Sequence, residues 1–164
     1  MSLKTEAYFR ELAAENLTRA HVSEPPVSLD ALANGLGIPV RPVNLPSFFG
    51  GAIVSEDGLP VMLVNYARSE TERRIAMAHM LAHVMLMLDG HTDGYPRDGS
   101  AHQDADSLAK ELLLPAGMLA AQARLWFNDH RYLARLFGVD EADMVARMKE
   151  LQLIKGPSGV VWDY

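Results

Sequence analysis

The stretch that decides the fold is Ile75-Ala76-Met77-Ala78-His79-Met80-Leu81-Ala82-His83-Val84-Met85-Leu86-Met87-Leu88, an apolar run that contains two histidines. Ser69-Glu70-Thr71-Glu72 precedes it and places carboxylates where they stabilise the N-terminal end of a helix. Asp89-Gly90 follows it and is typical of a helix end. The run is shorter than the about 20 residues that a membrane-spanning helix needs. The sequence therefore predicts a buried core helix.

The two histidines of this helix have the spacing of metal ligands. His79 and His83 are four positions apart, so their imidazoles lie on one face of the helix and can point to one metal ion. In zinc peptidases with the H-E-x-x-H motif, a glutamate after the first histidine is the general base. Here that position is Met80, which cannot accept a proton. The pattern indicates a metallopeptidase scaffold without its standard base, although two core histidines bonded to backbone carbonyls would give the same spacing.

The composition is that of an ordinary globular protein without disulfides. The chain has 164 residues, 49% hydrophobic and 22% charged, so it can bury a core of its own, and we expect one domain over 1–164. It has no cysteine, which leaves His, Asp and Glu as metal ligands and fits a reducing cytoplasm. The net charge of −6 argues against a broad nucleic-acid surface. The first residues lack the apolar core of a secretory signal.

Outward from the histidine helix, the pattern predicts an α+β fold, in which a small antiparallel three-stranded sheet packs on a helical bundle. Three strand-like runs precede the helix, at 38–43, 49–54 and 60–64. The last two are separated by Glu56-Asp57-Gly58, which is typical of a hairpin turn. The other helical patterns lie at 4–21, 28–36, 103–114, 116–124, 129–137 and 140–151.

A third metal ligand has to come from outside the histidine helix. A polar loop at 91–100 is expected to lead from it to the next helix. On that next helix Asp104 and Glu111 share a face, and Asp104 can reach inward from the first turn. Asp104 is therefore the predicted third ligand, with a helix-capping role as the alternative. His91 and His102 are more simply interpreted as solvated loop histidines.

Five segments of the chain, taken in order, resemble one known family. They are the Pro-Pro-Val to Leu-Gly-Ile stretch at 25–38, the apolar-Val-Asn at 61–65, the histidine helix at 73–83, the acidic-Ala-Asp to Leu-Leu-x-Pro stretch at 104–115, and 133–154. This order resembles the ImmA/IrrE family of zinc-dependent peptidases, small cytoplasmic proteins of prophages and stress-response loci. The resemblance runs over roughly residues 5 to 154. It implies a zincin-like H-x-x-x-H helix and a zinc ion that activates water to cleave a helix-turn-helix transcriptional repressor.

The chain departs from the family pattern at two positions of the implied site. The family's catalytic glutamate aligns with Met80, and its glutamate zinc ligand aligns with Asp104, which would complete the ligand set with His79 and His83. Loss of a positioned proton acceptor typically costs about 10²–10⁴-fold in rate. We therefore expect a zinc-binding protein with impaired peptidase activity that binds a repressor rather than cutting it. The alternatives are an active endopeptidase with another base and a metal-free interaction module.

Two C-terminal segments complete the expectations. Residues 132–153 resemble a helix-turn-helix unit, but a DNA reader needs cations on its second helix. That helix carries more acidic than basic residues: Asp140, Glu141, Asp143 and Glu150 against Arg147 and Lys149. The sequence thus predicts packing on the domain, with no direct nucleic-acid contact and no membrane partner. The tail, 155–164, is expected to pack down through Val160, Val161 and Trp162.

Overall fold

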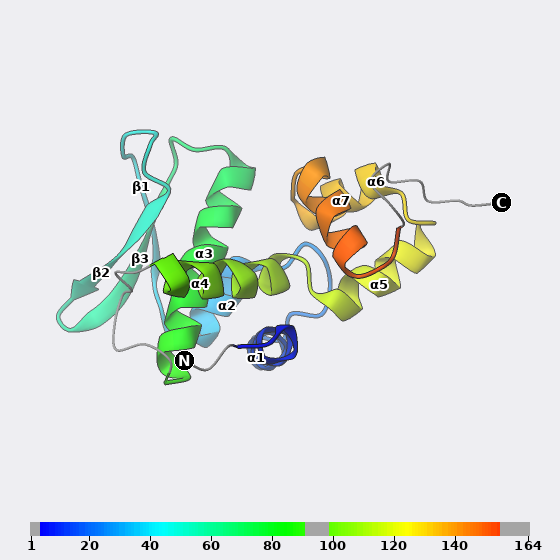
Figure 1. Cartoon of the computed structure of the whole chain (residues 1–164). Helices are drawn as coiled ribbons and strands as arrows, with labels where there is room; N and C mark the ends of the chain where they lie inside the picture. The colour runs from blue at the N-terminus through cyan, green and yellow to red at the C-terminus, as the bar shows by residue number, and fades with distance from the viewer. Residues whose placement is uncertain (1–3, 91–98, 155–164) are drawn as a thin grey trace.

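The computed structural model describes residues 4–90 and 99–154. Most of the loop predicted at 91–100, with His91, and the whole tail at 155–164 lie outside the described residues. Within these ranges the chain forms seven helices and a three-stranded sheet, the α+β fold that the sequence predicted (Figure 1). In chain order the elements are α1 (Glu6–Arg19), α2 (Leu29–Gly35), β1 (Val40–Val43), β2 (Gly51–Glu56), β3 (Leu59–Asn65), α3 (Glu70–Leu88), α4 (Gly99–Leu113), α5 (Ala116–Leu125), α6 (His130–Phe137) and α7 (Glu141–Glu150).

The sheet is mixed, which corrects the predicted antiparallel arrangement. Its strand order is β1-β3-β2, so β3 lies in the middle. β3 pairs antiparallel with β2 and parallel with β1, where Val40 lies opposite Met62. The predicted hairpin turn between β2 and β3 is confirmed. Its two central residues, Asp57 (φ 51°) and Gly58 (φ 80°), adopt the left-handed conformation that a two-residue hairpin loop favours.

The loop that joins β1 to β2 is held in place at the end of β3. The side-chain amide of Asn65, the fully buried last residue of β3, holds this loop across the end of β3. Its Oδ1 accepts from the amide of Leu45 at 3.0 Å, and its Nδ2 donates to the carbonyls of Pro46 at 3.0 Å and Phe49 at 2.7 Å. The loop after β1 crosses the end of β3 and leads to β2 at the far edge of the sheet. The hairpin after β2 then places β3 between β2 and β1.

The histidine helix, α3, occupies the centre of the fold. Ser69 caps it through a capping box in which the Ser69 hydroxyl accepts from the Glu72 amide and the Glu72 carboxylate accepts from the Ser69 amide. Nine residues between Met77 and Leu86 are buried, as expected of a helix that is covered on several sides. The sheet lies on one side of α3, and α4 crosses it (Figure 1). This crossing positions the candidate site.

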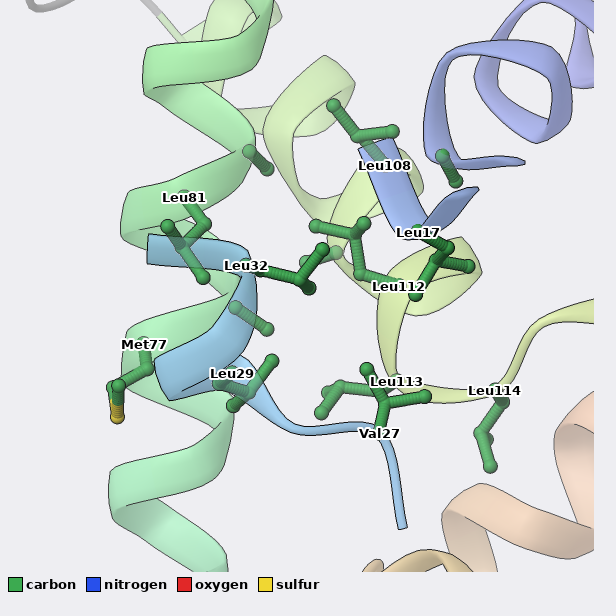
Figure 2. Packing of buried hydrophobic residues seen from close by; sticks show 14 of the residues in the cluster. Leu17, Val27, Leu29, Leu32, Met77, Leu81, Leu108, Leu112, Leu113 and Leu114 are labelled. Carbon is green, nitrogen blue, oxygen red and sulfur yellow. The ribbon is translucent and has the colours of Figure 1, made fainter. Parts of the chain in front are cut away.

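One hydrophobic cluster connects the helices and β3. It contains buried residues from all seven helices, and Figure 2 shows the part in which α2 packs between α3 and α4 through Leu29 and Leu32. α7 is attached to α4 by a buried ion pair in which Arg147 donates to Glu111 at 2.5 Å. The C-terminal helices thus pack on the rest of the described chain, as the sequence predicted. None of the helices within 4–90 and 99–154 is long and apolar enough to cross a membrane.

Candidate metal centre

Three histidine side chains meet where α3 crosses α4. His79 and His83 come from consecutive turns of α3, and His102 comes from near the start of α4. The Nε2 atoms of His79 and His83 are 2.9 Å apart, and the Nδ1 atom of His102 lies 3.3 Å from each of them. Among the described residues, these three form the group of His, Asp or Glu side chains whose ligand atoms gather closely enough to hold a metal ion.

The geometry and chemistry of this cluster fit zinc. A tetrahedral zinc ion with zinc–nitrogen distances of about 2.0–2.1 Å needs nitrogens about 3.3 Å apart, close to the observed triangle. Three histidines with an open fourth position are a donor set found in zinc sites that bind water or substrate. Burial first, and then the neighbouring His79 and His102, lower the pKa of His83 to about 4. His83 is therefore neutral near pH 7, as a metal ligand must be.

The structure brings together two of the three predicted ligands, His79 and His83. Asp104 is not in the cluster: its carboxylate accepts a hydrogen bond from Lys4 Nζ at 2.5 Å. Asp104 as a ligand therefore stays a prediction. His102, which the sequence analysis treated as a loop histidine, lies in the third position.

A sequence signal for His102 was present but depended on where α4 begins. The expected helix began at residue 103, whereas α4 begins at Gly99, so His102 lies within it. From there His102 shares a helix face with Asp106, four positions later. The oxygen Oδ1 of Asp106 lies 2.8 Å from the Nδ1 atom of His79. A histidine-and-aspartate pair on α4 thus faces the histidine pair on α3, and sequence reasoning missed both of its members.

A pocket of about 580 Å³ opens beside the cluster. Its walls come from α3, α4, α7 and the start of β2, and His79 and Met80 lie side by side along it. Much of its apolar lining is buried: Met80, Ala109, Leu113 and Leu114. Most of its charged residues are more exposed: Arg68, Glu72, Asp106, Lys110, Asp143 and Glu150. A concave apolar surface bordered by charges beside a metal-ligand cluster is typical of a binding site.

Met80 lines the pocket at the sequence position that the general base has in H-E-x-x-H peptidases. Its side chain is 4% exposed and packs against Gly51 at the start of β2. A Cβ at Gly51 would lie 2.8 Å from the Met80 methyl carbon, so the thioether uses the space that this glycine leaves. Two of the nearby carboxylates have structural partners: Glu72 completes the α3 capping box, and Glu150 pairs with Arg147.

A histidine pair on a buried helix, a third histidine on a crossing helix and a small sheet beside them are features of a zinc-peptidase-like protein. The chain belongs to the Peptidase M78 family, described as an IrrE N-terminal-like domain, whose sequence profile matches residues 33–149. This confirms the resemblance found in the sequence. The match begins in α2 and ends in α7, so it includes the three histidines and every pocket-lining residue except Glu150.

Comparison with solved structures adds the fold of one related protein. A Mycobacterium tuberculosis transcriptional regulator superposes with a TM-score of 0.61 at 19% sequence identity, over 88% of this chain and 48% of that protein. The present chain thus spans about half the length of that regulator, and at this identity the similarity shows the fold alone. No curated protein matches the chain.

Proposed function

We propose that this protein is a zinc-binding member of the M78 family that binds a helix-turn-helix repressor in the cytoplasm and has lost most of the family's peptidase activity. The observation that carries this proposal is a cluster of three converging imidazoles, one of which, His79, lines the same pocket as the apolar Met80. In this proposal His79, His83 and His102 hold the metal. The pocket then binds a segment of the repressor.

The binding part of the proposal rests on the shape and lining of the pocket. Its volume of about 580 Å³ can accommodate several side chains of a peptide, and its buried apolar residues favour apolar ones. Charges of both signs at its border can fix the register of a bound segment through polar contacts. When bound, zinc would supply a Lewis acid that polarises a carbonyl group in that segment. The family and the regulator-like fold support a repressor as the partner.

The loss of activity follows from the chemistry at position 80. A thioether takes no proton, and the absence of a positioned base typically costs about 10²–10⁴-fold in rate. Met80 lines the pocket, and a glutamate of similar length could occupy the space that its side chain fills. A glutamate at this position would therefore face the same pocket.

Cleavage by Met80→Glu tests this proposal. The substrate is a candidate helix-turn-helix repressor, incubated with zinc-loaded protein and followed by mass spectrometry. Wild type should bind the repressor but cleave it slowly, and Met80→Glu should cleave at least about 10²-fold faster. Met80→Gln is the matched control, because glutamine has the shape of glutamate but cannot act as a base, and it should remain slow. Efficient cleavage by wild type that Met80→Glu leaves unchanged would contradict the proposal.

Metal analysis tests the ligand set. Protein purified without chelator or added metal should contain zinc, and the absence of bound zinc even after loading would favour a metal-free interaction module. His102→Ala should lose the metal, whereas Asp104→Ala should keep it. The opposite result would restore Asp104 as the third ligand.

An active endopeptidase is a second candidate, because two further carboxylates line the same pocket. Asp106 lies beside His79, and Asp143 comes from α7. If wild type cleaves efficiently, Asp106→Asn and Asp143→Asn identify which of them serves as the base: the essential one should lose about 10²-fold or more in rate.

A further inference from the structure

The contact between His79 and Asp106 determines which nitrogen of the His79 ring carries the hydrogen. A neutral imidazole carries a hydrogen on one nitrogen and a lone pair on the other, and the partner of each nitrogen decides which is which. Asp106 Oδ1 lies 2.8 Å from His79 Nδ1. An ionised carboxylate only accepts hydrogen bonds, so Nδ1 carries the hydrogen. The Nε2 atom of His79 then presents its lone pair to the other two histidines.

The helix crossing places this carboxylate on the opposite side of the ring from the cluster. His102 and Asp106 are one turn apart on α4, so His102 approaches the Nε2 edge of the His79 ring while Asp106 reaches its Nδ1 edge. The His79 and His102 rings are nearly parallel, at 9° and 5.5 Å between centroids. The His79 ring is therefore held from two directions by one helix.

We propose that Asp106 is a positioning residue of the metal site: its hydrogen bond fixes the tautomer and orientation of His79 and thereby raises the affinity for zinc. This inference rests on the proposed function in one respect, namely that the three histidines hold a metal. Carboxylates that bond the second nitrogen of a histidine ligand typically change metal affinity by about 10–100-fold. Asp106 would not bind the metal itself and would affect it only through the hydrogen bond to His79.

The exposure of Asp106 makes the inference testable without unfolding the protein. Its side chain is 71% exposed, so its truncation removes little packing. An ordinary surface contact would leave zinc affinity unchanged when removed. Asp143 is a matched control, because it is a second carboxylate of the same pocket, and its truncation changes the net charge equally. A loss of zinc affinity in Asp106→Ala that is absent from Asp143→Ala therefore cannot be due to the change in net charge alone.

The experiment measures the zinc Kd by competition with a chromophoric chelator for wild type, Asp106→Ala, Asp106→Asn and Asp143→Ala. Asp106→Ala should bind zinc about 10–100-fold more weakly than wild type. Asp143→Ala should match wild type. Asp106→Asn, whose side-chain oxygen can still accept from Nδ1, should recover part of the loss. Nitrogen-15 NMR of the metal-free protein should show the hydrogen of His79 on Nδ1 in wild type and a mixture of tautomers in Asp106→Ala.

The outcomes separate this inference from the proposed function. If wild type binds zinc and Asp106→Ala has the same Kd as Asp143→Ala, the role of Asp106 is overturned while the zinc site stands. If wild type binds no zinc, the proposed function and the inference fail together. An unchanged tautomer in Asp106→Ala would also overturn the inference, whatever the zinc affinity.

Discussion

Replacing Arg147 by methionine should destabilise the fold far more than removing any exposed charge. Arg147 is 2% exposed and donates to Glu111 at 2.5 Å and to the Leu114 carbonyl at 3.1 Å. Breaking a buried ion pair costs about 3–5 kcal/mol. Arg10 remains 3.6 Å from the Glu111 carboxylate and partly compensates its charge, so the cost lies at the lower end, about 3 kcal/mol. The carbonyl left without its donor adds about 1 kcal/mol, so the total is about 4 kcal/mol.

Urea unfolding of three variants measures this effect. With a slope of about 2 kcal/mol per molar urea, Arg147→Met should lower the midpoint by roughly 2 M. Lys110→Met is the control, because it removes an exposed pair with Glu150 and should cost at most about 1 kcal/mol. Arg147→Met combined with Glu111→Leu should recover most of the loss, since neither charge is then left buried. A double variant no more stable than Arg147→Met would refute the reasoning.

Three further predictions follow from buried groups. The metal-free protein should lose stability as the pH falls from about 6.5 to about 4, because the unfolded chain protonates His83 near 6.5 and the folded chain only near 4; thermal scans should show this dependence weakened in His83→Gln. Gly51→Ala should cost about 1–3 kcal/mol, because its Cβ would lie 2.5 Å from a β3 carbonyl oxygen; Gly117→Ala, in open space on α5, should not destabilise a parallel urea titration. Mobility shifts at low salt should show no tight duplex binding, since Arg147 is buried in its ion pair; salt-sensitive sub-micromolar binding would contradict this.

The sequence predicted the elements that depend on local signals. The start of α3 after Ser69 and the turn at Asp57-Gly58 each require particular residue types at fixed positions, and each lies where it was expected. The pairing of β1 with β3 could not be predicted in this way. Hydrophobic alternation defines strands but not their order, and the contacts that Asn65 makes with the loop between β1 and β2 join residues about 20 positions apart in sequence.

The candidate site was half predicted for a similar reason. The spacing of His79 and His83 lies within one helix, so it could be found from the sequence. His102 comes from a second helix, and its place depends on α4 beginning four residues earlier than expected, at Gly99. His102 and Asp106 are one turn apart and share a helix face, whereas Asp104, two positions from each, lies on the other side of the helix. Residue 102 therefore faces the histidines, while Asp104 pairs with Lys4.

Helix α4 contributes both to the histidine cluster and to the pocket wall. It carries His102 and Asp106 at one end and Glu111, which anchors α7, further along. A segment bound between α4 and α7 would contact α4, the helix that carries His102 and Asp106. By thermodynamic linkage, any increase in partner affinity caused by zinc must be matched by an equal increase in zinc affinity caused by the partner. Under the proposed function, the zinc concentration would then set how tightly this protein holds its partner.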